Sequence, residues 1–346
     1  MVQTHTVEGD GGVRLAVREW PGEDPSILLL HGLASSSHIW DLVAPRLTPQ
    51  FRVVAFDQRG HGVSGKPSSG YGFDRLIADA AAVIRTLGLG RPVAVGHSWG
   101  ANVALQLAVD RVQLVSGDIL VDGGFLSMRD RMDWRTARTM LAPPQLKGMS
   151  LEQFRAGMRT FTQGAVELTP EVEAVFLSLM RVDHDGNIHP RLSRANHLRI
   201  LRALWEQDAQ ELLRRVRVPT LVLAVRSAPG EADPGGFMEE KERAAEAVNA
   251  IDQAVRFEWI EGIHDIPIDR TVRPGGRRMS SMFVFILILL LLAAVFGILG
   301  IVLKTALVIT LAILLTIAFL SLFAYYWFRY RVYRFRRELE RHSRSS

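Results

Sequence analysis

A serine stands where the sequence could supply a nucleophile. The run from Gly96 to Gly100 reads Gly-His-Ser-Trp-Gly and has Ser98 at its centre, with an apolar segment before it and a helical pattern over residues 101–108 after it. We therefore expect a strand, a sharp turn that needs small flanking residues, and a helix. Such a turn exposes the hydroxyl beside free helix N–H groups, which favour negative charge. Plain structural turns share the five-residue pattern, but this context favours a nucleophile.

The segments around this turn alternate between strand and helix patterns. Short apolar runs predict strands at 13–20, 27–30, 53–56, 93–95, 119–121, 219–225 and 255–260, and amphipathic segments predict helices at 73–87, from 101 onwards and at 238–250. This alternation predicts an α/β fold with a doubly wound, mostly parallel sheet. We assign residues 1–124 and 212–273 to this core.

The strand pattern stops between residues 125 and 211, where helical segments alternate with Pro and Gly breaks. Thr169 and Pro170 predict a helix start, with threonine as the cap and proline in the first turn. This insertion separates two sheet strands at their carboxyl ends, where the active sites of such sheets open. We therefore expect a helical cap over the site.

Charge is distributed unevenly along the chain. The net charge is +5, but residues 270–346 hold 12 Lys and Arg against 2 Glu, so the remainder is mildly acidic. An acidic remainder argues against a nucleic-acid partner. The chain lacks cysteine, which excludes disulfides and thiolate metal sites. Its first residues show no apolar segment of the kind that signal peptides carry.

Four motifs follow one another along the chain. They are His31-Gly32, Asp57-x-Arg59-Gly60-x-Gly62-x-Ser64, the run from Gly96 to Gly100, and Gly262-x-His264. Together they resemble the α/β-hydrolase superfamily over roughly residues 10–270. The resemblance implies a serine nucleophile at Ser98, a general base at His264, and an oxyanion hole made by the backbone N–H groups of Leu33 and Trp99. It implies no cofactor or metal ion, and it gives His31, His97, Asp57 and Arg59 structural roles.

Two residues are candidates for the carboxylate that orients His264. The commoner position in the family follows the strand at 219–225, where the next aspartate is Asp233, in a Pro- and Gly-rich loop. Asp122 directly follows the strand at 119–121, a position that some haloalkane dehalogenases of the superfamily use. A rigid strand end orients a side chain better than a flexible loop does. We therefore favour Asp122 and keep Asp233 as the alternative acid.

The C-terminal part departs from this family. Phe283 to Phe328 form an apolar stretch of 46 residues that only Lys304 interrupts, too long for one membrane span. We expect a linker at 274–281, two transmembrane helices at 282–328 and a basic tail at 329–346. Arginines flank the stretch on both sides, so the positive-inside rule predicts a hairpin with the hydrolase on the cytoplasmic face. An equally open alternative is a truncated hydrolase fused to a small membrane protein that begins at Met279.

These patterns predict a membrane-tethered serine hydrolase that cleaves an ester or related acyl bond through an acyl-enzyme. Serine at the turn disfavours dehalogenase and epoxide hydrolase activity, because those members of the superfamily carry aspartate there. The expected partners are a small acyl substrate and the lipid bilayer. The alternative is a catalytically inactive hydrolase fold with a binding or anchoring role, since fold does not fix function. The sequence indicates neither the substrate nor the oligomeric state.

Overall fold

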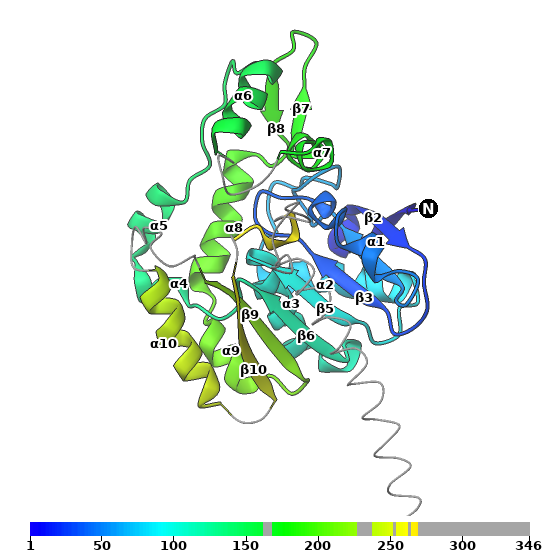
Figure 1. Cartoon of the computed structure of the whole chain (residues 1–346), viewed down its shortest axis with the longest axis vertical. Helices are drawn as coiled ribbons and strands as arrows, with labels where there is room; N and C mark the ends of the chain where they lie inside the picture. Colours follow the sequence, from blue (N-terminus) through cyan, green and yellow to red (C-terminus); the bar gives the residue numbers. More distant parts are fainter. Residues whose placement is uncertain (162–167, 227–236, 252–253, 262–263, 269–346) are drawn as a thin grey trace, which may run out of the picture. The chain divides into compact units, whose positions relative to one another are not determined.

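The computed structural model describes residues 1–161, 168–226, 237–251, 254–261 and 264–268 (Figure 1). The chain divides into two compact units, Met1–Leu287 and Ile288–Ser346, and every described residue lies in the first unit. The predicted linker, transmembrane helices and basic tail, residues 274–346, lie outside the described residues. Among the residues that are described, no helix combines the length and the apolar character that crossing a membrane requires.

The described residues form a mostly parallel, eight-stranded sheet in the order β1-β2-β4-β3-β5-β6-β9-β10. In this sheet the pairs β1–β2 and β2–β4 are antiparallel, and all other neighbouring strands are parallel. The central strands β3 and β4 are buried along their whole length, as expected for strands covered on both faces. The strands are β1 (Gln3–Glu8), β2 (Arg14–Trp20), β3 (Ile27–Leu30), β4 (Val53–Phe56), β5 (Val93–His97), β6 (Gly117–Val121), β9 (Thr220–Arg226) and β10 (Val255–Glu261).

Helices follow most strands and pack their apolar sides on the sheet. In α2, buried residues recur at helical spacing from Leu76 to Ile84, which gives one apolar face. The helices are α1 (Ala44–Leu47), α2 (Phe73–Thr86), α3 (Trp99–Asp110), α4 (Met128–Arg131), α5 (Trp134–Met140), α6 (Leu151–Phe161), α7 (Pro170–Ser178), α8 (Arg194–Glu206), α9 (Ala209–Arg215) and α10 (Phe237–Asn249), with 3₁₀ turns η1 (Asp10–Gly12), η2 (Ser37–Trp40), η3 (Val112–Leu114) and η4 (Ile266–Ile268).

The segment predicted as a cap contains α4 to α8 and, in addition, a small antiparallel hairpin of β7 (Met180–Val182) and β8 (Ile188–Pro190). Figure 1 shows α6, α7 and this hairpin grouped together, with α8 running from them toward the sheet. The predicted start of α7 is present, because the Thr169 side chain accepts a hydrogen bond from the N–H of Val172. The hairpin is a departure from the purely helical cap that we expected. Its strands have three residues each, too few to show a period in the sequence.

Candidate active site

Ser98 joins β5 to α3 in a conformation that few residues other than glycine adopt, with φ 54° and ψ −124°. The turn is closed on both sides of it. A Cβ atom on Gly96 would lie 2.2 Å from the carbonyl oxygen of Gly100, and one on Gly100 would lie 2.3 Å from the carbonyl oxygen of Leu30. Both glycines are therefore required. Backbone strain of this kind gathers at functional sites, and here it holds a serine at the tip of the turn.

Three predicted site residues meet in one hydrogen-bonded chain. His264 lies beyond the end of β10, and its Nε2 is 2.9 Å from Ser98 Oγ. Its Nδ1 is 2.6 Å from Asp122 Oδ2. Because a carboxylate only accepts hydrogen bonds, Nδ1 carries the proton and Nε2 is free to accept the proton of Ser98. The acid side chain is 2 % exposed and the His264 side chain 54 %, so the base is accessible and the acid is enclosed.

The pKa values of Asp122 and His264 follow from the contacts between them. Burial alone would raise the pKa of Asp122, but the hydrogen bond from His264 and the charges of His264 and Lys241 lower it to about 2. Desolvation alone would lower the pKa of His264, yet the hydrogen bond and the charge of Asp122 raise it above the ordinary value. A carboxylate that stays ionised beside a more basic imidazole is the electrostatic state that suits a general base.

Asp122 is fixed by its backbone as well as by its side chain. It follows β6 with φ 45°, its N–H donates to the carbonyl of Leu223, and its Oδ1 accepts the N–H of Val225 at 3.0 Å. The next residue is held equally tightly, since a Cβ atom on Gly123 would lie 2.1 Å from the carbonyl oxygen of Ser98. The sequence pattern does not single out Gly123. The alternative acid, Asp233, lies outside the described residues.

The two residues expected to form an oxyanion hole flank Ser98. Trp99 is the first residue of α3, and Leu33 follows Gly32, where an added Cβ atom would lie 3.2 Å from Ser98 Cβ. Within the part of the chain that the structure describes, no hydrogen bond uses the backbone N–H of Leu33 or of Trp99. Both donors are thus available to a negatively charged oxygen that develops near Ser98.

Two buried histidines hold the loop that carries Leu33. His31 Nδ1 donates to the carbonyl of Gly32 at 2.8 Å, and its Nε2 accepts the N–H of Gln58 at 3.0 Å. His61 Nε2 accepts the N–H of Ala34 at 3.2 Å. Each of these Nε2 atoms must be unprotonated to accept, and burial lowers the pKa of both rings, which keeps them neutral.

The second motif of the sequence braces this side of the site. Arg59 donates two hydrogen bonds to the Asp79 carboxylate, at 2.6 and 2.8 Å, and both side chains are buried. Asp57 accepts the N–H groups of Ser37 and Val63, each at 2.8 Å. Arg59 thus joins its loop to helix α2, and Asp57 joins two loops to each other.

Two further side chains contact the Ser98–His264–Asp122 chain, and sequence reasoning missed what they do. His97 precedes the nucleophile and its Nε2 donates to the carbonyl of His264 at 2.8 Å. Lys241, on α10, donates to Asp122 Oδ1 at 2.7 Å. The position of His97 beside Ser98 was a signal, although we had assigned it only to the turn. No local pattern marks Lys241.

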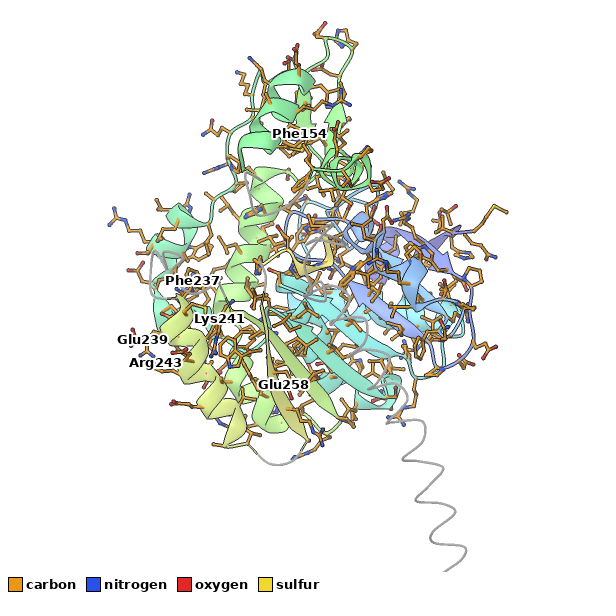
Figure 2. The ribbon with its side chains drawn as sticks, viewed as in Figure 1. Phe154, Phe237, Glu239, Lys241, Arg243 and Glu258 are labelled. Carbon is orange, nitrogen blue, oxygen red and sulfur yellow. The ribbon has the colours of Figure 1, made fainter. Side chains whose placement is uncertain are left out.

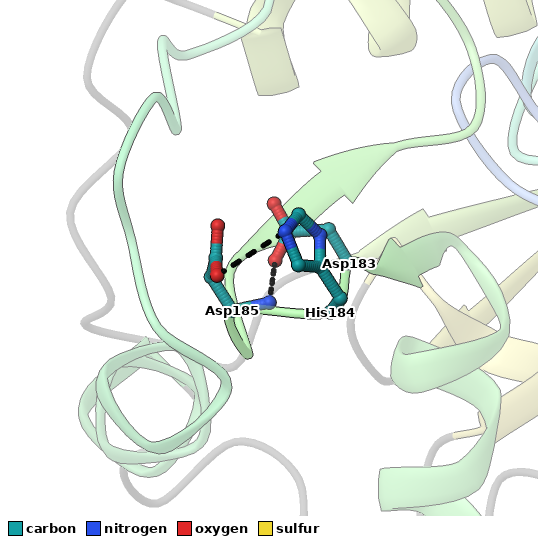
Figure 3. A group of neighbouring side chains, drawn as sticks. All are labelled: Asp183, His184 and Asp185. Carbon is teal, nitrogen blue, oxygen red and sulfur yellow. Dashed lines mark hydrogen bonds and ion pairs between the residues drawn. The ribbon is translucent and has the colours of Figure 1, made fainter.

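One exposed group of possible metal ligands lies elsewhere, at the turn between β7 and β8. Figure 3 shows Asp183, His184 and Asp185 there, with one ligand atom from each within 4.8 Å of the others. The carboxylate of Asp183 accepts the N–H groups of Asp185 and Asn187 and contacts His189 Nε2 at 2.7 Å. These contacts account for Asp183 as a turn-forming residue.

Comparison with known proteins places this geometry in context. The model of a family described as alpha/beta hydrolase fold matches residues 25–227. The 2-(acetamidomethylene)succinate hydrolase of Mesorhizobium japonicum is 39 % identical over 112 residues, which are 32 % of this chain and 40 % of that protein. The aligned part thus spans less than half of this curated relative.

Two solved structures extend the likeness to about three quarters of the chain. The crystal structure of E-2-(acetamidomethylene)succinate hydrolase has a TM-score of 0.63 at 24 % identity, and covers 78 % of this chain and 94 % of that one. An N-formylmaleamic acid deformylase from Pseudomonas putida S16 has a TM-score of 0.59 at 20 % identity, with coverages of 78 % and 96 %. At these identities the likeness concerns the fold.

Proposed function

The chain belongs to the α/β-hydrolase family, and we propose that it is a serine hydrolase that cleaves an ester or related acyl bond through Ser98, His264 and Asp122. One observation carries the proposal. Ser98 Oγ, the His264 ring and the Asp122 carboxylate form an unbroken hydrogen-bonded chain, with distances of 2.9 and 2.6 Å. Nucleophile, base and orienting acid in this order are the arrangement that serine hydrolysis requires.

The proposed reaction has two steps. In the first, His264 Nε2 takes the proton of Ser98 Oγ while Oγ attacks the acyl carbon, and the N–H groups of Leu33 and Trp99 stabilise the oxyanion. The protonated imidazole then gives its proton to the leaving group, and the acyl group remains on Ser98. In the second step His264 activates a water molecule that releases the acid. Asp122 stays ionised throughout, holds the imidazole tautomer and stabilises the imidazolium.

The serine at position 98 and the proteins similar to this chain indicate which classes of substrate to test. Serine supports acyl transfer rather than dehalogenation or epoxide opening, which use aspartate at this position in the family. The similar proteins include a hydrolase of 2-(acetamidomethylene)succinate and a deformylase of N-formylmaleamic acid. Small amides with carboxylate groups therefore belong in a screen beside esters of graded acyl length.

The test is a hydrolysis screen of the full-length protein against p-nitrophenyl esters and these small amides, with Ser98→Ala as the matched control. We expect at least one substrate to turn over, and Ser98→Ala to reduce its kcat by several orders of magnitude while far-ultraviolet circular dichroism stays unchanged. Turnover that survives Ser98→Ala undiminished would refute the nucleophile. A folded protein with no turnover of any substrate would favour the inactive, binding or anchoring alternative.

We further propose that residues 282–328 tether this hydrolase to a membrane as a two-helix hairpin, with the hydrolase on the cytoplasmic side. The support comes from the sequence. The apolar stretch of 46 residues would measure about 69 Å as one helix, against a bilayer core of about 30 Å. Seven arginines between Arg329 and Arg344 follow it and four precede it, so both ends favour the cytoplasm. A lysine at the far turn, Lys304, can extend its ammonium into water.

Cysteine accessibility tests this topology directly, because the chain has no cysteine of its own. Single variants Ser68→Cys, Lys304→Cys and Ser343→Cys would be treated with an impermeant maleimide in intact cells. We expect labelling only at position 304. Labelling at position 343 but not at position 68 would mean that the chain crosses the membrane once. If none of the three positions is labelled in intact cells and all three are labelled equally after lysis, no part of the chain crosses the membrane.

A further inference from the structure

Lys241 reaches the candidate site from α10. Its Nζ donates to Asp122 Oδ1 at 2.7 Å and to the carbonyl oxygen of Val225 at 3.0 Å. Its side chain is only 13 % exposed, against 2 % for Asp122. Figure 2 shows Lys241 on the side of α10 toward β9, and Glu239 and Arg243 on the opposite side. This lysine is therefore enclosed between helix and sheet, unlike its neighbours.

The two donors on Oδ1 determine how the acid meets the base. The N–H of Val225 and the ammonium of Lys241 both bind Asp122 Oδ1, at 3.0 and 2.7 Å. This leaves Oδ2 to His264, at 2.6 Å. Rotation of the carboxylate would break the bonds on both oxygens. Because Lys241 also binds the carbonyl of Val225, it connects the carboxyl end of β9 to the acid that follows β6.

We propose that Lys241 is a positioning residue for the hydrolytic reaction: it fixes the Asp122 carboxylate in the orientation that meets His264, and its positive charge offsets part of the negative charge that His264 experiences. The proposal rests on the proposed function, since it assigns Lys241 a role toward the acid and base of that reaction. In this role Lys241 acts through Asp122.

The charged groups around His264 oppose one another. Desolvation lowers the pKa of His264, Asp122 on β6 raises it by hydrogen bond and charge, the adjacent Asp265 also raises it, and Lys241 on α10 lowers it. His97 on β5 adds no charge near neutral pH, because burial and the charge of His264 lower its pKa to about 4. Removal of the ammonium should remove one of the two effects that lower the pKa of His264 and so raise that pKa. A lysine that only joins α10 to the sheet would have no such effect.

The test compares four full-length proteins: wild type, Lys241→Met, Lys241→Arg and Arg243→Met. Lys241→Met removes the charge and keeps an apolar stem, while Lys241→Arg keeps the charge. Arg243→Met is the matched control, since it removes a cation from the same helix whose side chain is 67 % exposed and paired only loosely with Glu239, at 3.9 Å. The pKa of His264 is measured by NMR with ¹³C-labelled histidine, assigned with His264→Gln. The pH profile of kcat/KM is measured on the same proteins.

We expect Lys241→Met to raise the pKa of His264 by about one unit, to move the acid limb of kcat/KM by the same amount, and to reduce kcat at the optimum about tenfold. Lys241→Arg should restore the wild-type pKa, and Arg243→Met should retain it. If Lys241→Met does not fold, Lys241→Gln, which is neutral but polar, replaces it in the comparison.

An unchanged pKa of His264 in the folded neutral variant, or an equal shift in Arg243→Met, would overturn the proposal. A lower kcat with an unshifted profile would likewise reduce Lys241 to a structural contact. The NMR titration needs no substrate. Failure of the proposed function, seen as absent hydrolysis, is therefore distinguishable from failure of this assignment.

Discussion

The two ends of strand β6 each carry a buried aspartate, and the two side chains differ in their hydrogen bonds. Asp118, near the amino end, is 1 % exposed, and Asp122, directly after the carboxyl end, is 6 % exposed. Neither oxygen of Asp118 has a hydrogen-bond partner in the described part of the chain. Asp122 binds three donors, from Val225, Lys241 and His264. Two aspartates that are both buried thus differ in their hydrogen-bond partners.

This difference moves the pKa values of the two carboxyl groups in opposite directions. Burial raises the pKa of Asp118 well above its ordinary value, and the nearby N–H of Ile119 counters only part of the effect. For Asp122 the same burial is outweighed by His264 and Lys241, and the pKa falls to about 2. Position in a sheet therefore does not determine the pKa of a buried aspartate; the donors gathered around it do. The carboxyl end of β6, where loops and α10 meet, supplies them.

The largest expected effect is the loss of activity in Asp122→Asn. Asparagine cannot hold the same tautomer of His264 or stabilise its protonated form, so kcat for ester hydrolysis should fall by about 10⁴-fold. Asp118→Asn is the matched control on the same strand and should keep activity within about twofold of wild type. A severe loss from Asp233→Asn, with only a mild loss from Asp122→Asn, would show that the acid lies on the other loop.

The pH dependence of activity should show the effect of the Asp122 charge on the pKa of His264. Because Asp122 raises the pKa of His264, the acid limb of kcat/KM should have its midpoint above 6.5 and fall tenfold per pH unit below it. The limb reflects protonation of the base, which then cannot accept the proton of Ser98. Asp118→Asn should leave the midpoint unchanged. A wild-type midpoint below 6.5 would mean that desolvation of the ring outweighs the carboxylate.

The smallest expected effect concerns stability and involves Asp118. Its pKa is raised in the folded state, so its contribution is fully present below the unfolded pKa, near 3.8, and is lost as pH rises toward the folded pKa. Asparagine does not ionise. Relative to wild type, Asp118→Asn should therefore gain about 1.4 kcal/mol in free energy of unfolding per pH unit within that window. Urea denaturation between pH 5 and 8 measures it, and parallel curves for the two proteins would contradict the raised pKa.

Local patterns were enough to place Ser98, His264 and Asp122 at strand ends. Gly96 is required by contacts within the turn itself, whereas Gly100 is required by the carbonyl oxygen of Leu30 at the end of the neighbouring strand. Both His264 and Asp122 come just after predicted strands. Parallel strands bring their carboxyl ends to one edge of the sheet, so their meeting there could be expected from the order of elements. The sequence could not choose between Asp122 and Asp233 except on rigidity, and only the first is among the described residues.

Other features depend on contacts that no local pattern records. Lys241 binds an acid 119 positions earlier in the chain, and it looks like any lysine of an amphipathic helix. Gly123 matters because of the Ser98 carbonyl oxygen, which lies 25 residues before it in the sequence. Strand β1 was also not predicted, because it pairs only at the sheet edge and four of its six residues are exposed. In each case tertiary contact, and not residue type, gives the role.

Covalent labelling with a fluorophosphonate tests the central claim most directly, since the probe reacts with a serine only when a base activates it. The full-length protein would be treated with the probe and digested, and the adduct located by mass spectrometry. We predict one adduct per chain, on the peptide that contains Ser98, and no adduct in Ser98→Ala. The rate of labelling should be greatly reduced in Asp122→Asn and unchanged in Asp118→Asn. A folded wild-type protein that is not labelled, or labelling that persists in Ser98→Ala, would contradict the assignment of Ser98, His264 and Asp122 as a catalytic unit.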